Sequence, residues 1–294
     1  MKKRLVSVFV AMTVVSCMAT GCGKEVSQTT DTQTQVQTET SKEETKTEEA
    51  PVEVKEERKA EEVSESDFSV YDLEDGTVGI DSYKGEATDI IVPDTIDGKT
   101  VTELRNLNGK VTSVVLPDSI VKICDSAFAN CGELKSVILG NGIKEIGYLA
   151  FQNCWELTSI NFPESLTDIG DSSFSSSGLA SVSIPSGISE IIGTFSCTKL
   201  TNVVIPGNVK KIDKQAFYMC PNLEEVVFED GVEYIESDTF SICENLKKAV
   251  IPASVTYIGN FAFEMSSEDF VIVTPAGSYA ESFAIENEIP YENQ

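Results

Sequence analysis

A motif of about 23 residues recurs seven times along the chain, and this period leaves few folds open to it. The motif reads L-x-x-V-x-I-P-x-x-I-x-x-I-x-x-x-A-F-x-x-C. A unit this short buries its apolar face only by stacking on its neighbours, so the period predicts a solenoid. The units are spaced 23, 23, 22, 21, 23 and 23 residues apart and begin at Val111, Leu134, Leu157, Leu179, Leu200, Leu223 and Leu246.

Phenylalanine and proline follow the same period. Seven of the fourteen phenylalanines occupy one position of the unit, and six of the ten prolines occupy another. The first set is Phe128, Phe151, Phe174, Phe195, Phe217, Phe240 and Phe263; the second is Pro93, Pro117, Pro163, Pro185, Pro206 and Pro252. Their confinement to single positions indicates that the repeat is a structural unit rather than a chance similarity.

Each unit predicts three short elements. The V-x-I-P segment has apolar residues at every second position, which predicts a short strand. The proline ends this strand because it has no N–H to donate to the ladder. The I-x-x-I segment predicts a second short strand or an extended turn. The A-F-x-x-C segment predicts one turn of helix that points the phenylalanine inward. Units three and four are shortened, with Ser177 in the cysteine position and Cys197 displaced, so we expect a local irregularity there.

The two ends of the repeat array predict caps. Two strand-like runs flank Asp75-Gly76, which is typical of a hairpin. At the other end, residues 278–284 have a helical pattern. The sequence therefore predicts an N-terminal cap with a degenerate repeat over 67–110, repeats over 111–269 and a C-terminal cap over 270–294.

The repeat resembles the BspA-type leucine-rich repeat of bacterial surface proteins over residues 68–291. Both flanks share this resemblance, through Gly76-Thr77 with Ile80, Tyr83 and Gly85, and through Ala276-Gly277-Ser278-Tyr279-Ala280 with Ile289-Pro290-Tyr291. It implies a leucine-rich repeat solenoid, a strand-rich α/β fold with a parallel concave sheet, and a role in surface attachment or protein binding. It implies no catalytic residues, because the positions that define the family are core positions.

The N-terminus predicts export. Three basic residues precede an apolar run, Leu5 to Val15, that is too short to span a bilayer. Ala19-Thr20-Gly21-Cys22 resembles the bacterial lipobox, so we expect a lipoprotein signal peptide over 1–21 and lipidation of Cys22. Cys17 follows a similar sequence and is the second candidate. An ordinary cleaved signal with an incidental cysteine is the alternative.

Residues 22–66 predict a disordered acidic linker. From Gly23 to Ser66 the chain has thirteen acidic residues, six basic ones and no aromatic residue. Such a segment buries too little apolar area to offset the entropy of ordering it. It is interpreted as a stalk, although a featureless spacer has nearly the same composition.

Charge and the absence of histidine exclude several functions. A net charge of -26 opposes binding to nucleic acid and to anionic lipid. Without histidine the chain has no Ser-His-Asp or Cys-His nucleophile and lacks the commonest zinc ligand. Glu145, Asp168 and Glu190 share one repeat position, which a solvated face explains more simply than an active site. We therefore predict no enzyme, no metal and no cofactor.

Four cysteines occupy the repeat position and predict core packing. Cys131, Cys154, Cys220 and Cys243 are expected to be free buried thiols, since a small side chain fits a stacked interior. The alternative is a disulfide between cysteines 23 residues apart on adjacent units.

Two sets of side chains are candidates for ligand binding. The first lies between the buried strand positions and consists of Val115, Ile138, Val204, Val227 and Val250, continuing Ile91 and interrupted by Asn161 and Ser183. β-propensity is the alternative explanation for this stripe. The second set is aromatic and consists of Tyr148, Trp155, Tyr234 and Tyr257, since exposed tryptophan and tyrosine often dominate binding. Incidental packing along a rim is the alternative here.

These observations favour a lipid-anchored bacterial cell-surface module that binds an extracellular protein or glycan. It would contact the membrane through its N-terminal lipid only. The alternative is a structural cell-envelope lipoprotein that contacts cell-wall components or sister proteins.

Overall fold

The computed structural model describes residues 63–107 and 109–294. The predicted signal peptide, Cys17, Cys22 and the linker up to residue 62 lie outside the described residues. The folded unit begins slightly before residue 67. Val63 packs against the core, and Ser64 caps a short 3-10 helix, η1 (Glu65–Asp67). The last four residues of the predicted linker therefore belong to the folded unit.

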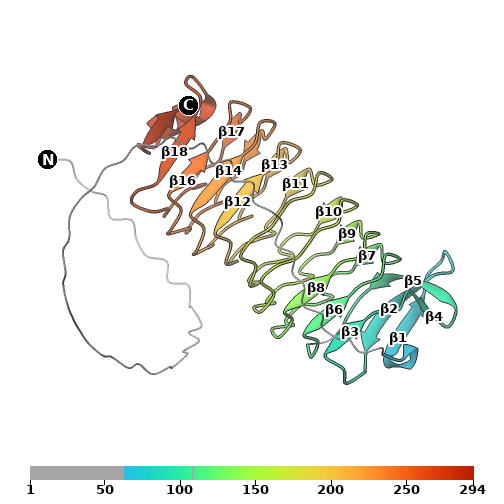
Figure 1. The fold of residues 1–294 in the computed structure, drawn as a ribbon. Coiled ribbons are helices and arrows are strands. Elements are labelled where there is room, and N and C mark those ends of the chain that lie inside the picture. Colours follow the sequence, from blue (N-terminus) through green and yellow to red (C-terminus); the bar gives the residue numbers. More distant parts are fainter. Residues whose placement is uncertain (1–62, 108) are drawn as a thin grey trace, which may run out of the picture. The chain divides into compact units, whose positions relative to one another are not determined.

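The repeats form a solenoid whose strands are parallel from unit to unit, as the period predicts (Figure 1). The V-x-I-P segments lie in two sheets. A three-stranded sheet contains β3 (Asp89–Ile91), β6 (Ser113–Val115) and β8 (Ser136–Ile138). A five-stranded sheet contains β12 (Asn202–Ile205), β14 (Glu225–Phe228), β16 (Lys248–Val250), β18 (Val271–Thr274) and β19 (Tyr291–Asn293).

The I-x-x-I segments form two further sheets, so they are short strands rather than extended turns. In the N-terminal half these are β7 (Lys122–Ile123), β9 (Glu145–Ile146) and β10 (Asp168–Ile169). In the C-terminal half they are β11 (Glu190–Ile191), β13 (Lys211–Ile212), β15 (Tyr234–Ile235) and β17 (Tyr257–Ile258).

Both ends have the predicted kinds of cap. The N-terminal hairpin joins β1 (Phe68–Asp72) to β2 (Val78–Tyr83) in antiparallel register. It leads into the solenoid because β2 pairs in parallel with β5 (Lys99–Leu104), which also pairs with β4 (Thr95–Ile96). At the other end, helix α1 (Tyr279–Glu286) starts at Ser278, whose Oγ accepts a hydrogen bond from the Glu281 N–H at 3.1 Å.

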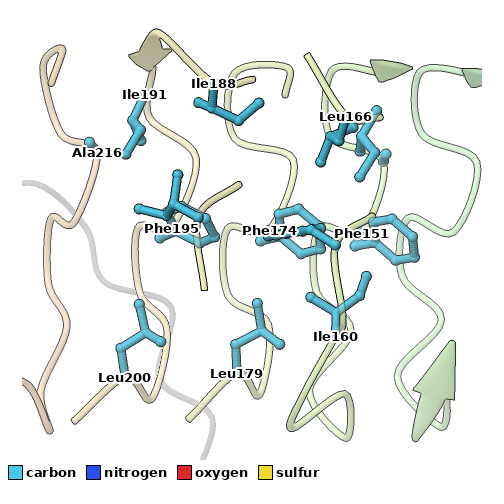
Figure 2. Packing of buried hydrophobic residues seen from close by; sticks show 14 of the residues in the cluster. Phe151, Ile160, Leu166, Phe174, Leu179, Ile188, Ile191, Phe195, Leu200 and Ala216 are labelled. Atoms are coloured by element: carbon cyan, nitrogen blue, oxygen red, sulfur yellow. The ribbon is translucent and has the colours of Figure 1, made fainter. Parts of the chain in front are cut away.

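The core is organised around a column of seven stacked phenylalanines, one from each unit. Neighbouring rings lie 4.7 to 5.8 Å apart between centroids. Figure 2 shows Phe151, Phe174 and Phe195 in one row, with leucines and isoleucines of the same units packed on either side. All seven rings are buried. The repeat period therefore arises from one aromatic position that stacks on itself.

The predicted turn of helix in the A-F-x-x-C segment is wrong. In the first unit, Ser126 and Asn130 have φ values of 59° and 63°, which a right-handed helix excludes. The Phe128 N–H donates to the Ala150 carbonyl of the next unit at 2.7 Å, instead of to a carbonyl four residues back. The segment is a series of turns that hydrogen-bonds from one unit to the next, and we call this inter-unit pairing the turn ladder.

The irregularity expected in units three and four is present. The sheet of V-x-I-P strands is interrupted between β8 and β12. The sheet of I-x-x-I strands is interrupted between β10 and β11. The turn ladder crosses this break, because the backbone N–H of Phe151 donates to the Ser173 carbonyl at 2.6 Å and that of Phe174 donates to the Thr194 carbonyl at 3.0 Å. Thr198, rather than Cys197, occupies the buried cysteine position.

Among residues 63–107 and 109–294, no helix is long and apolar enough to cross a membrane.

Candidate binding surfaces

The strand stripe predicted from the sequence points outward from two separate sheets. Ile138 and Val204 are 60% and 50% exposed, whereas Val115, Val227 and Val250 are half-buried. Strand pairing brings the stripe together in two groups, each with its side chains directly opposite one another. These groups are Ile91, Val115 and Ile138, and Val204, Val227 and Val250. The break between the sheets lies where the stripe has Asn161 and Ser183.

Ion pairs border the C-terminal group of the stripe. Lys247 Nζ lies 3.3 Å from Glu224 Oε2, and Lys248 Nζ lies 2.9 Å from Glu225 Oε1. All four side chains are substantially exposed, so each pair contributes at most about 0.5 kcal/mol. These pairs therefore contribute little to the stability of the fold.

Trp155 is exposed, as its position in the repeat predicts. Its side chain lies over the preceding unit, where a Cβ on Gly132 would come within 2.9 Å of Cε3 of the indole. Trp155 as a residue is 58% exposed, so part of its side chain lies against the preceding unit and the rest faces solvent. Tyr148, in the same unit, is 49% exposed, and its N–H donates to Asp125 Oδ1 at 2.9 Å. Exposure of both is confirmed; their role in binding stays a prediction.

Tyr234 and Tyr257 lie on a different sheet from the strand stripe. They are direct partners in the parallel pairing of β15 and β17, and both are exposed. Neighbouring strands place charged residues at the same position, including Lys211 and Glu190. The structure therefore brings these two tyrosines together but does not join them to the apolar stripe.

A polar groove near the N-terminal cap was not predicted. It has a volume of about 570 Å³ and is lined in part by Asp81, Arg105, Lys122 and Cys124. Arg105, the only arginine among residues 63–294, lies over the ring of Tyr71 at 3.7 Å from its centroid. The lining is polar and balanced in charge, because Asp81 and Asp125 offset Arg105 and Lys122. The degenerate unit that supplies Arg105 departs from the repeat, so alignment of the units does not reveal this groove.

Tyr71 is held in place beneath Arg105. Its hydroxyl donates to Glu103 Oε2 at 2.7 Å. Burial, and then the hydrogen bond to this carboxylate, raise the pKa of Tyr71 well above its usual range. The phenol therefore acts as a fixed donor and as a support for the guanidinium.

The predicted column of carboxylates lies on three successive strands, of which β9 and β10 are paired and β11 belongs to the next sheet. Asp168 is the direct partner of Glu145, and Glu190 occupies the corresponding position in the next unit. Two of the three acids have lysine partners, since Lys122 lies 2.7 Å from Glu145 and Lys211 lies 2.9 Å from Glu190. In the described part of the chain, no group of three acidic or sulfur ligands is arranged to hold a metal ion.

The cysteines of the repeat position are core residues. The six cysteines within the described ranges are free, and four of them are buried. Cys154, Cys220 and Cys243 each donate from Sγ to the carbonyl of a phenylalanine in the preceding unit at 3.2 Å. Burial raises the pKa of Cys131 to about 11, so this thiol is protonated at neutral pH.

Three solved bacterial leucine-rich repeat proteins resemble the chain. The T. pallidum leucine-rich repeat protein is 26% identical, with 79% of this chain and 98% of that chain covered and a TM-score of 0.50. A protein of Bacteroides capillosus is 28% identical, with coverage of 41% and 95% and a TM-score of 0.37. One from Bacteroides ovatus is 18% identical, with coverage of 70% and 83% and a TM-score of 0.38.

No curated protein matches the chain. Residues 105–194 and 192–288 match the family described as "BspA type Leucine rich repeat region", in six copies. These two ranges contain all seven stacked phenylalanines, the turn ladder and the cysteine position. Because the family matches more than half of the chain, and its pattern coincides with the stacked core of the solenoid, the chain belongs to the BspA-type leucine-rich repeat family.

Proposed function

We propose that the chain is a lipid-anchored protein of the bacterial cell surface that binds an extracellular protein or glycan through its solenoid. The repeat-based fold supports a role as an interaction module, because stacked units present a long rigid surface whose exposed residues differ from unit to unit. The proposal assigns no catalysis to the chain and requires no metal or cofactor.

The observation that carries this proposal is the position of Trp155. A tryptophan that is 58% exposed leaves a large apolar surface in water. Its contact with Gly132 limits the ring to few orientations, so little conformational entropy is lost when a ligand covers it. Rigid exposed tryptophans are frequent anchors in binding surfaces, and a flat indole face suits both apolar side chains and sugar rings.

Replacing Trp155 with alanine is expected to lower ligand capture about tenfold, because the main anchor is removed. The test presents the immobilised chain with extracellular-matrix, mucin and cell-wall extracts and measures the bound material. Tyr148→Ala should have a smaller effect in the same direction. Tyr279→Ala is the matched control, since Tyr279 is an exposed aromatic residue of the C-terminal cap.

Equal capture by wild type and Trp155→Ala contradicts the assignment of this surface. The identity of the captured material separates the two cellular roles. Matrix or mucin supports binding to an external partner, whereas cell-wall material alone supports the structural envelope role.

Anchoring is proposed through Cys22, and its removal is expected to abolish lipid attachment. Labelled palmitate should be incorporated into wild type and into Cys17→Ser but not into Cys22→Ser, because the thiol of the mature N-terminus is the acylated nucleophile. The Cys22→Ser chain should also leave the membrane fraction. Retained label in Cys22→Ser together with lost label in Cys17→Ser would instead place the lipid on Cys17.

A further inference from the structure

A second apolar surface lies on the turn side of the C-terminal units, away from the strand stripe. Met219, Ile242 and Met265 precede the cysteine position in three successive units, and we call them the turn ridge. Met219 and Met265 are 43% and 57% exposed, and Ile242 is half-buried. The turn ladder aligns them, because the backbone N–H of Met219 donates to the Ser241 carbonyl at 3.0 Å and that of Ile242 donates to the Glu264 carbonyl at 2.8 Å.

The backbone at the turn ridge is unfavourable for the side chains that it carries. Met219, Ile242 and Met265 have φ values of 54°, 61° and 57°. This left-handed conformation is tolerated by asparagine but costs energy for bulky side chains, and most for a β-branched one such as Ile242. The first two units place Asn130 and Asn153 at the same position. Exposed apolar side chains that strain the backbone do not serve the stability of the solenoid, which points to a role in contact with a partner.

The surroundings of the turn ridge are acidic. The three aligned turn segments, residues 213–222, 236–245 and 259–268, contain six acidic residues and one lysine. Glu244, Glu264 and Glu268 are exposed there. A second copy of the chain would bring the same negative charge, and an anionic lipid surface would be repelled. The complementary partner is therefore apolar along one line and basic on either side of it.

The spacing of the turn ridge matches that of a helix. Adjacent units of a parallel ladder lie about 4.8 Å apart. Residues three and four apart on an α-helix are separated by about 4.5 and 6 Å along its axis, at 1.5 Å per residue. Apolar side chains at that period can therefore contact successive ridge residues, and basic side chains beside them can reach the acidic rim.

We propose that the turn ridge binds a basic amphipathic α-helix of a partner protein. This inference rests on the proposed function as an interaction module, but it uses residues remote in sequence from Trp155. Methionine suits such a surface, because its flexible thioether adapts to helices of different sequence.

The test uses the full chain and a synthetic helical peptide of about 14 residues, long enough to span the ridge. The peptide carries leucine at every third or fourth position and lysine on its remaining surface. Binding is measured by calorimetry, and it should weaken as salt is raised because the acidic rim contributes. The triple variant Met219→Asn, Ile242→Asn and Met265→Asn should bind about tenfold more weakly or worse.

Asparagine makes this variant a fair test of the surface, because Asn130 and Asn153 already occupy the same backbone conformation. The variant should fold at least as stably as wild type, and Met265→Asn alone should show the same effect more weakly. Val204→Thr with Val227→Thr is the matched control, since it removes one exposed and one half-buried apolar group from the strand stripe and should leave peptide affinity unchanged.

Wild-type affinity in the triple variant, or equal affinity for a peptide of the same composition with its leucines scattered, would overturn the inference. Trp155→Ala should not affect peptide binding. If the peptide fails to bind while Trp155→Ala still lowers capture from the extracts, the turn ridge is refuted and the proposed function stands.

Discussion

Replacing Phe174 with alanine is expected to split the unfolding of the solenoid into two transitions. Phe174 stacks between Phe151 and Phe195, at centroid distances of 5.0 and 5.8 Å, and meets Phe162 edge-on at 5.5 Å. It is fully buried, so its truncation should cost about 3–5 kcal/mol. This stabilisation is lost at the place where, within the described ranges, no β-sheet pairing joins the N-terminal and C-terminal halves of the solenoid.

The weakness at this place has two structural causes. The sheets on both faces of the solenoid are interrupted near Phe174, so no β-strand pairing in the described chain joins the units there. The turn ladder and the phenylalanine column do continue across this break. In addition, the hydroxyls of Ser173 and Ser177 are buried with no hydrogen-bond partner among the described residues. Each such hydroxyl costs about 1–3 kcal/mol. In a solenoid, each unit contacts only its neighbours, so cooperative unfolding depends on the free energy of each interface between units. The interface at Phe174 is weak in wild type, so a further loss there should uncouple the two halves.

Phe240 provides a matched control within a continuous part of the solenoid. It also stacks on two rings, Phe217 and Phe263, and meets a third, Phe228, edge-on. Its neighbours, however, belong to units joined by β14, β16 and β18. Phe240→Ala should lower the free energy of unfolding by a similar amount. It leaves the contacts across the break at Phe174 as they are in wild type.

Trp155 allows the two outcomes to be distinguished. It is the only tryptophan and lies on the N-terminal side of Phe174, so its fluorescence reports that half, whereas circular dichroism reports both. In denaturant, the two signals should separate for Phe174→Ala and change together for Phe240→Ala. Coincident transitions in Phe174→Ala would show that the break does not weaken coupling between the halves.

The positions that the sequence predicted well are those that stack on themselves. The phenylalanine column, the strand positions and the caps follow from periodicity, because a buried position must be apolar in every unit. Phe151 and Cys154 are buried for this reason. Exposure of Trp155 followed from the same comparison, since its position varies from unit to unit.

The prediction of a helical turn failed because residue type does not reveal left-handed backbone. Leu149 and Ile242 have positive φ although neither favours it, and inter-unit hydrogen bonds impose this conformation. The turn ridge was missed for the same reason, since methionine and isoleucine at a repeated position resemble core residues. The strand stripe was predicted as one surface interrupted at Asn161 and Ser183, and missing strand pairing in these middle units divides it into two groups.

Replacing Gly142 with alanine is expected to destabilise the N-terminal units by about 3 kcal/mol, at the upper end for overpacking. A Cβ at this position would overlap the carbonyl oxygen of Asp118 and come within 3.1 Å of the Ile120 carbonyl oxygen. Both atoms belong to the backbone of the preceding unit, so no flexible side chain can move aside. The two units would have to separate, and separation weakens every stacking contact between them.

Gly109→Ala tests whether the effect comes from this close approach rather than from the loss of glycine itself. Among the described residues, a Cβ on Gly109 meets nothing closer than the Asn130 carbonyl oxygen at 3.8 Å, so the change should alter stability by no more than about 0.5 kcal/mol. Thermal unfolding followed by Trp155 fluorescence measures both variants. Equal melting temperatures would mean that the units adjust to an added methyl group, and that the distance between them is not set by backbone contact at Gly142.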